Sequence, residues 1–180
     1  MNVESIILLV IIVAGGIAVL GSYVLGLRGA SDGAASLWGG VSQRLRPVYV
    51  VSMLLSAIGF LAVLYYLFFE ADPQEIAIGG QPGFTLLYPI FVLILAPSAL
   101  WMPLTKLYVQ SPNTGLWIAV RSVLFIVGLA SIALAWALFA LEPAGSSVAY
   151  WFAVAGSLYF AFHTFVLDAL VWAALSKRAS

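Results

Sequence analysis

The hydrophobic positions of this chain form long uninterrupted runs, each bounded by charged residues, Gly or Pro. A bilayer core about 30 Å thick requires about 20 apolar residues of helix. Five runs reach that length, and they predict membrane-spanning helices over residues 6–25, 48–69, 84–104, 116–141 and 148–175. The whole chain, residues 1–180, is therefore expected to form a single all-α integral membrane domain, a bundle of five transmembrane helices.

The composition supports a lipid environment and excludes several classes of protein. Hydrophobic residues make up 64% of the chain and charged residues 8%, against roughly 45 to 50% and about 25% in soluble domains. Seven basic residues balance seven acidic ones, so there is no basic field for binding nucleic acid. Because Cys is absent and His163 is the single histidine, we expect no metal centre. Motifs for phosphate binding or nucleophilic catalysis are also absent, so we do not expect an enzyme.

The distribution of charges predicts an orientation. All seven Lys and Arg residues fall on one side of the five-span arrangement: Arg28, Arg44, Arg46, Lys106, Arg121, Lys177 and Arg178. The other side receives no Lys or Arg, and it carries five of the acidic residues: Glu4, Glu70, Asp72, Glu75 and Glu142. Since basic residues concentrate on the cytoplasmic side of membrane proteins, we expect the N-terminus outside and the C-terminus in the cytoplasm. The first five residues carry no base, so the first span is expected to be retained rather than cleaved as a signal peptide.

Two segments indicate how the helices could pack and be covered. Span 1 places small residues at four-residue spacing, at positions 14, 18, 22 and 26, and such a stripe lets another helix approach closely, from the same chain or from a second copy. The longest connection, residues 26–47, is rich in Gly, Ala and Ser with Trp38 in its middle. This connection is either a plain linker or an amphipathic lid over the cytoplasmic end of the bundle.

Span 3 contains three prolines, Pro89, Pro97 and Pro103. Each removes a backbone donor and tends to bend the helix. The bend could border a ligand cavity with Tyr88, Trp101 and Met102, or the bent helix could simply pack against its neighbours.

Span 5 carries two ionisable residues, His163 and Asp168, and such groups inside a membrane are costly and often functional. At 100° per residue they differ by about 140°, so they are not expected on one helix face. Tyr159 lies one turn before His163. His163 could be a structural residue whose hydrogen bonds are made within the protein, a ligand contact, a haem ligand or part of a proton relay.

Asp168 has a candidate partner on span 4. Arg121 and Asp168 lie at similar predicted distances from the cytoplasmic ends of their spans. Because an unpaired charge in lipid costs several kcal/mol, we expect the two to form an ion pair, which could also close a ligand cavity on its inner side.

Two short segments resemble the tryptophan-rich sensory protein or translocator protein family. Trp101 to Leu104 look like that family's W-x-P-L in helix 3, and Leu167, Asp168 and Trp172 look like its L-N-x-x-x-W in helix 5, with Asp in place of Asn. The resemblance implies a five-helix membrane protein that binds tetrapyrroles, sterols or other lipophilic molecules. A tetrapyrrole would then be a ligand, and no further cofactor is implied.

The combined expectation is a bundle that binds a lipophilic small molecule, for sensing or transport. Ligand sites pair apolar walls with a few polar groups, and the residues expected to contact the ligand are Trp38, Tyr88, Trp101, Tyr159, His163 and Trp172. The alternative is a structural or accessory subunit of a larger membrane complex. Besides lipid and ligand, a second copy of the chain or such a complex is the expected partner.

Overall fold

The computed structural model describes residues 2–27 and 37–176. Four continuous helices are α1 (Val3–Leu27), α2 (Arg46–Phe69), α3 (Leu87–Gln110) and α4 (Thr114–Phe139). A fifth helical rod consists of α5 (Val148–Ala161), the π-helix η2 (Phe162–Trp172) and α6 (Ala173–Leu175). Each of the five is long and apolar enough to cross a membrane, so the five predicted helices are confirmed.

Short strands at one end of the bundle account for two differences from the predicted boundaries. Three strands, β1 (Ala77–Ile78), β2 (Gln81–Pro82) and β3 (Leu141–Glu142), form an antiparallel sheet in the order β2-β1-β3. The sheet takes Leu141 from the predicted span 4, and α3 begins after it at Leu87 rather than at Phe84. Gly79 and Gly80 both have positive φ, as a two-residue hairpin turn requires. The Gly-Gly pair, which lies between the predicted spans 48–69 and 84–104, was therefore a hairpin signal in the sequence.

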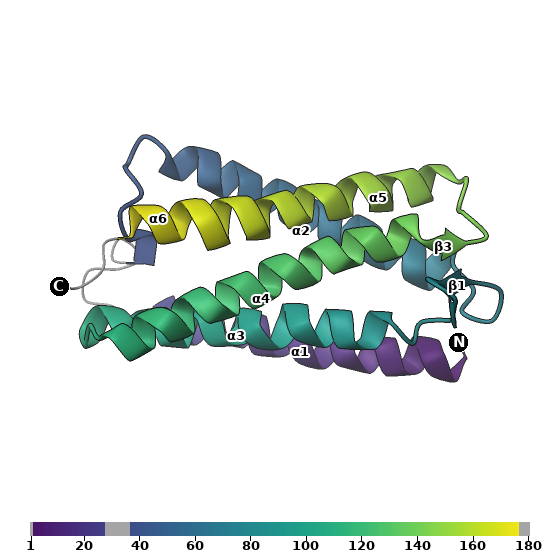
Figure 1. Ribbon diagram of the computed structural model, residues 1–180, viewed down its shortest axis with the longest axis horizontal. Coiled ribbons are helices and arrows are strands. Elements are labelled where there is room, and N and C mark those ends of the chain that lie inside the picture. The colour runs from purple at the N-terminus through teal and green to yellow at the C-terminus, as the bar shows by residue number, and fades with distance from the viewer. Residues whose placement is uncertain (1, 28–36, 177–180) are drawn as a thin grey trace.

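The helices pack in the order α1, α3, α4, α5 with η2, and α2. Figure 1 shows α4 crossing the bundle obliquely, beside α3 at one end and beside α5 at the other. Among the described residues, α1 and α2 pack on different neighbours and make almost no contact with each other. We call the region between these two outermost helices of the series the seam.

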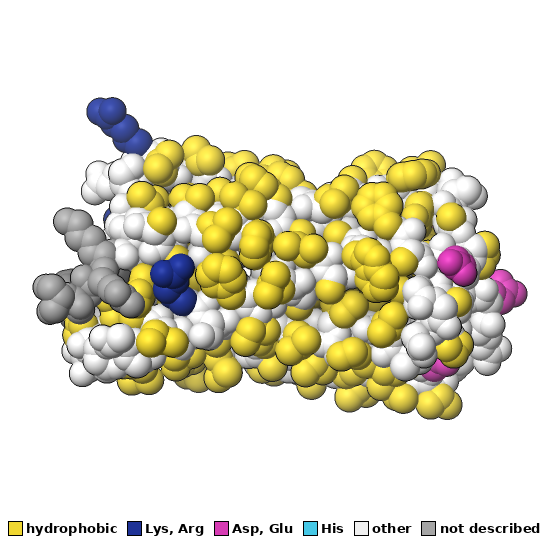
Figure 2. Space-filling model, in the orientation of Figure 1, with side chains coloured by type: hydrophobic (Ala, Val, Ile, Leu, Met, Phe, Trp, Pro, Cys, Tyr) yellow, Lys and Arg dark blue, Asp and Glu magenta, His cyan; other side chains and the backbone are white. Residues whose placement is uncertain are grey.

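The two ends of the bundle carry opposite charges, as the sequence predicted (Figure 2). We call the end with these described residues the basic end: Arg44, Arg46, Lys106 and Arg121. We call the other end, with these residues, the acidic end: Glu4, Glu70, Asp72, Glu75 and Glu142. Between the ends, the visible face is covered by apolar side chains. Large apolar side chains are also exposed along the helices, such as Leu20 of α1, which is 70% exposed. An exposed apolar band of this extent is typical of a surface that contacts lipid.

The buried core is divided into two apolar clusters. One lies toward the acidic end and includes Leu8, Val63, Phe91 and Leu134. The other lies toward the basic end and consists of Val41, Tyr49, Trp117, Val120, Leu124, Ala169, Trp172 and Ala173. Along α2 and the fifth rod, buried polar residues separate the two clusters: Ser52, Ser56, Ser157, His163 and Thr164. The bundle therefore has a polar layer between two apolar cores.

Small residues determine which helices approach most closely. A Cβ atom on Gly15 or Gly26 of α1 would collide with side chains of α3, so part of the small-residue stripe packs within the same chain. Ala14 and Ala18 remain exposed on α1. The closest approach is between α2 and α5, where Gly59 faces Gly156 backbone to backbone. This approach brings the polar residues of α2 within reach of the fifth rod.

Candidate functional site

The polar layer contains a chain of side-chain hydrogen bonds between α2 and the fifth rod. The Tyr159 hydroxyl donates to Ser52 Oγ at 3.1 Å, and Ser52 Oγ lies 2.9 Å from His163 Nδ1. Ser52 is 4% exposed, and His163 is also buried. The expectation that Tyr159 and His163 lie close together is met, because Ser52 connects them.

The π-helix overturns one expectation from the helical wheel. His163 Nε2 lies 3.6 Å from Asp168 Oδ2, so these side chains do share a face. The predicted separation of about 140° assumed a regular α-helix, whereas hydrogen bonds in a π-helix join residues five apart and bring positions i and i+5 together. His163 and Asp168 both lie within η2.

The hydrogen-bond partners indicate one tautomer of His163. A carboxylate is an acceptor, so the ring nitrogen that faces Asp168 is best placed as the donor, and Nδ1 is then free to accept from the Ser52 hydroxyl. The resulting order of donation runs from Tyr159 to Ser52 and from Ser52 to His163, whose other ring nitrogen faces Asp168 at 3.6 Å. Ser, His and Asp also form hydrolase triads, but here the Ser52 hydroxyl is buried and already contacts two neighbours.

The predicted ion pair between Arg121 and Asp168 is wrong. Within the described residues, Asp168 pairs with His163, and Arg121 is exposed with its guanidinium carbon 6.0 Å from the ring centroids of both Trp117 and Phe125. Arg121 and Asp168 were predicted at similar depths in the bundle, but the depth of a residue does not determine the direction in which its side chain points. The π-helix gave Asp168 a nearer partner on its own rod.

Aromatic side chains from four elements meet on the basic-end side of the polar layer. The ring centroid of Trp101 on α3 lies 5.9 Å from that of Tyr23 on α1 and 6.1 Å from that of Trp172 on η2. Trp172 in turn lies 6.3 Å from Trp117 on α4. The two segments that carry the family resemblance therefore meet at Trp101 and Trp172.

Two polar atoms of α3 in this region have no protein partner in the described structure. The indole nitrogen Nε1 of Trp101 and the hydroxyl of Thr105, which is 1% exposed, are buried without a hydrogen bond. The two residues lie one helical turn apart. A buried polar group that lacks a partner costs about 1 to 3 kcal/mol, so native structures usually supply one from the protein, water or a ligand.

Asp168 connects the polar layer to this aromatic group. Its side chain is 33% exposed although it lies within a helix apolar enough to span a membrane. Asp168 lies four positions before Trp172 on η2, and Trp172 packs with Tyr49 of α2 in the basic-end core cluster. Tyr49 also donates from its hydroxyl to the Leu167 carbonyl oxygen at 3.1 Å. We call the group Tyr23, Trp101, Thr105, Asp168 and Trp172 the Trp101–Asp168 site.

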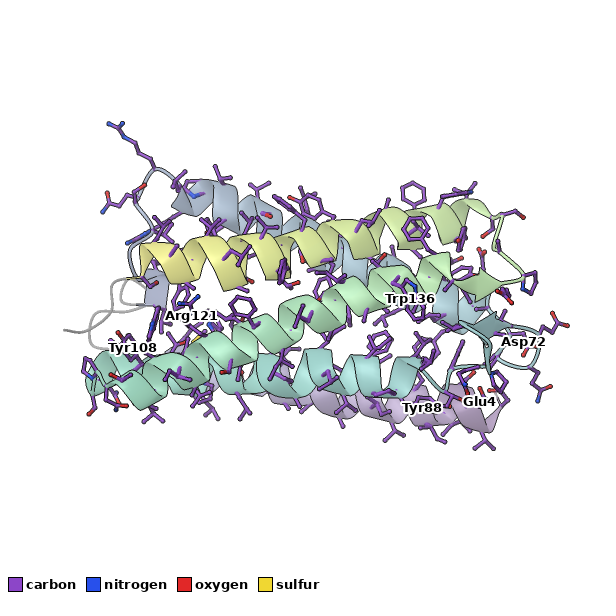
Figure 3. The ribbon with its side chains drawn as sticks, in the orientation of Figure 1. Glu4, Asp72, Tyr88, Tyr108, Arg121 and Trp136 are labelled. Atoms are coloured by element: carbon purple, nitrogen blue, oxygen red, sulfur yellow. The ribbon has the colours of Figure 1, made fainter. Side chains whose placement is uncertain are left out.

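Tyr88 does not belong to this site, contrary to expectation. Its hydroxyl donates to the Glu4 carbonyl oxygen at 3.3 Å, and it packs against the core cluster of the acidic end. Figure 3 shows Tyr88 and Glu4 together at that end, far along the bundle from Arg121. Tyr88 and Trp101 are separated by 13 positions of α3, which corresponds to about 20 Å along a helix.

Trp38 lies at the basic end, as the lid interpretation required. Its ring centroid is 6.3 Å from that of Tyr49, and the Arg46 guanidinium carbon lies 5.6 Å from the Trp38 ring centroid. Trp38 also packs against the basic-end core cluster. Residues 28–36 of the same connection lie outside the described residues.

The two clearest depressions among the described residues lie away from the enclosed cavity that the sequence predicted. One, of about 350 Å³, lies on α4 beside Arg121, and the other, of about 400 Å³, lies between α2 and α5 at the acidic end. Neither is lined by a predicted ligand residue. α3 runs without interruption through Pro97 and Pro103 to Gln110.

Several residues of the site were missed in the sequence. Ser52 and Ser56 lie one turn apart in an otherwise apolar span, and a polar stripe on such a span indicates the face toward the interior. That pattern could have placed Ser52 beside the fifth rod. Tyr23, Tyr49 and Thr105 lie among many other aromatic or hydroxyl residues, and no pattern distinguishes them.

A comparison of the chain with protein-family models, curated proteins and solved structures finds no match.

Proposed function

We propose that the chain is a multi-pass membrane protein whose basic end faces the cytoplasm. Five apolar helices and the apolar band between two oppositely charged ends support insertion. The positive-inside tendency supports the orientation, which places the N-terminus outside and the C-terminus in the cytoplasm.

The orientation is testable by labelling from one side of a sealed membrane. A cysteine introduced at Glu75, at the acidic end, should react with a membrane-impermeant maleimide added outside intact cells, and one introduced at Arg44 should not react until the membrane is opened. Both positions are exposed, and the chain has no native cysteine to interfere. The reverse pattern would overturn the proposed orientation.

We further propose that the Trp101–Asp168 site binds a lipophilic small molecule, a tetrapyrrole, a sterol or a similar compound, for sensing or transport. The observation that carries the proposal is the unpartnered Trp101 Nε1 and Thr105 hydroxyl beside aromatic rings. A ligand with a hydrogen-bond acceptor would satisfy these groups, and its apolar body would stack on Trp101 and Trp172. The seam between α1 and α2 would admit the ligand from the lipid.

The resemblance to the tryptophan-rich sensory protein or translocator protein family supports the same class of ligand. Its two segments supply Trp101 from α3 and Asp168 with Trp172 from η2, which are three of the five residues that define the site. His163 and Tyr159 act behind the site, because their hydrogen bonds to Ser52 and the contact of His163 with Asp168 hold the carboxylate in place.

Tryptophan fluorescence of the purified protein tests the ligand proposal. A porphyrin, a sterol or a quinone should change the emission with a saturable dependence on concentration. Trp101→Phe keeps a ring and removes the N–H donor, so it should weaken binding about tenfold, as expected for the loss of one buried hydrogen bond.

Trp136→Phe is the matched control, since Trp136 lies on α4 toward the acidic end and is 53% exposed (Figure 3). It should bind like the parent protein. Equal affinities of Trp101→Phe and Trp136→Phe would show that the ligand does not bind at the Trp101–Asp168 site. A parent protein whose fluorescence responds to none of the three compounds would contradict lipophilic binding itself.

A second candidate function is that of an accessory subunit in a larger membrane complex. The observation that favours it is on α1, where Ala14 and Ala18 are exposed and a Cβ atom on Gly16 or Gly21 would meet nothing within 4 Å. Such a surface allows a helix of another chain to approach closely. Co-purification with a stable set of other membrane proteins in mild detergent would support this function, and a monomer or homodimer would support a self-contained binder.

A further inference from the structure

Arg121 is a cation on the surface of a helix that is apolar enough to span a membrane. It is the eighth residue of α4, which begins at Thr114, and so lies about 10 Å along the helix axis from the basic end. Its side chain is exposed, and the described residues include no carboxylate that pairs with it. The acid expected to neutralise it, Asp168, is held by His163.

The side chains around Arg121 form an open depression rather than a flat surface. The depression has a volume of about 350 Å³ and is lined by Trp117, Ile118, Arg121, Ser122 and Phe125. Trp117 and Phe125 lie one turn on either side of Arg121, each with its ring centroid 6.0 Å from the guanidinium carbon. The site therefore offers a cation, the neighbouring Ser122 hydroxyl and apolar walls.

This combination of groups matches the boundary between the headgroups and the hydrocarbon of a bilayer. A guanidinium is costly in the apolar region unless it reaches the interface or finds an anion. The planar guanidinium binds phosphate oxygens with two parallel hydrogen bonds, and a hydroxyl can add a third. The described acidic residues outside the helices lie at the opposite end, so the nearest abundant anions at this level are lipid phosphates.

We propose that the depression around Arg121 binds the phosphate of an anionic phospholipid from the leaflet at the basic end. The Arg121 guanidinium and the Ser122 hydroxyl donate to the phosphate oxygens, and one acyl chain lies along Ile118 and Phe125. Other cations of the same end, such as Arg44 and Arg46, add a positive field that favours an anionic over a zwitterionic lipid. This site is separate from the Trp101–Asp168 site and does not depend on the ligand proposed there.

Lipid titration of the delipidated protein in detergent tests the proposal. Phosphatidylglycerol should raise the thermal unfolding midpoint of the parent protein saturably, and phosphatidylcholine should raise it much less. Arg121→Gln should weaken the apparent affinity for phosphatidylglycerol about tenfold or more, since a hydrogen bond to a charged group contributes about 1.5 to 3 kcal/mol. Arg121→Lys, which keeps the charge but loses the planar pair of donors, should give an intermediate affinity.

Arg44→Gln is the matched control because it removes the same charge from an exposed position at the same end, outside the depression. It should lower the affinity for phosphatidylglycerol far less than Arg121→Gln does, because Arg44 adds to the positive field but donates no hydrogen bond to the phosphate. Equal losses in Arg44→Gln and Arg121→Gln would show a general field effect and overturn the site. Ser122→Ala should weaken binding less than Arg121→Gln, and it provides a second variant if Arg121→Gln does not fold.

Inorganic phosphate and glycerol 3-phosphate separate a lipid site from a site for free phosphate. Neither should displace phosphatidylglycerol, because the acyl chain contacts with Ile118 and Phe125 contribute to its binding. Displacement by either soluble anion at concentrations comparable to the lipid would overturn the lipid assignment. Bound phosphatidylglycerol can be counted directly by native mass spectrometry, and an unchanged count in Arg121→Gln would overturn the role of the guanidinium.

Discussion

Gly156→Ala should lower the free energy of unfolding by about 2 to 3 kcal/mol, the upper part of the range for overpacked cores. A Cβ atom at Gly156 would lie 2.5 Å from the Gly59 carbonyl oxygen and 2.7 Å from its Cα. Because these neighbours are backbone atoms, no side chain can rotate away, and α2 would have to move from α5. The free energy can be measured by titrating mixed detergent micelles with dodecyl sulfate and following the helical circular dichroism.

Gly16→Ala is the control for the helix propensity of alanine. A Cβ atom at Gly16 would meet nothing within 4 Å, so this variant should be unchanged or more stable by up to about 1 kcal/mol. Opposite signs for Gly156→Ala and Gly16→Ala would support the close contact of α2 with α5. A Gly156→Ala variant as stable as the parent would contradict that contact.

His163→Ala should also be costly, with an expected loss of about 3 kcal/mol. The change removes a buried ring and leaves a cavity, and it deprives Ser52 and Asp168 of their partner. Asp168 lies in a helix apolar enough to span a membrane, so the loss of His163 leaves its carboxyl without a compensating charge among the described residues, which is destabilising. The free energy of unfolding in the same detergent titration gives the comparison.

Two double-mutant cycles distinguish the observed contact between Ser52 and His163 from the predicted ion pair between Arg121 and Asp168. Ser52→Ala and His163→Ala should be coupled by about 1 kcal/mol, since each removes the other's hydrogen-bond partner. Arg121→Gln and Asp168→Asn should be additive within about 0.5 kcal/mol, because the described structure contains no ion pair between them. Coupling in the second cycle with additivity in the first would reverse this assignment of partners.

The helices and the charge asymmetry could be predicted because both depend on composition along the chain. A run of apolar residues long enough to cross a bilayer forms a helix wherever it packs, since its backbone hydrogen bonds are internal. The positions of basic and acidic residues at opposite ends follow from the same runs, and Figure 2 shows the same segregation in space. The largest difference between a predicted and an observed end is at α3, which continues to Gln110 rather than ending at Leu104.

The partners of individual side chains could not be predicted, because the hydrophobic runs do not show toward which neighbour each side chain points. The contact of His163 with Asp168 arises from a π-helical segment. The predicted separation of about 140° between them holds only for an α-helix, which turns 100° per residue. Tyr88 is separated from the site by distance alone, because the 13 positions between it and Trp101 span about 20 Å of helix. Trp101 and Trp172 were predicted to line one site, and the structure places their rings 6.1 Å apart.

By itself, the sequence determined that five apolar helices form and that their charged ends are segregated, because these properties depend on the identity and order of residues along each segment. Only the tertiary structure decided that His163 bridges Ser52 and Asp168, that Arg121 lacks an acidic partner among the described residues, and that Trp101 Nε1 is buried without one. These outcomes depend on the rotation of each helix about its axis. Rotation is determined by close contacts such as that of Gly59 with Gly156, which join residues far apart in the chain.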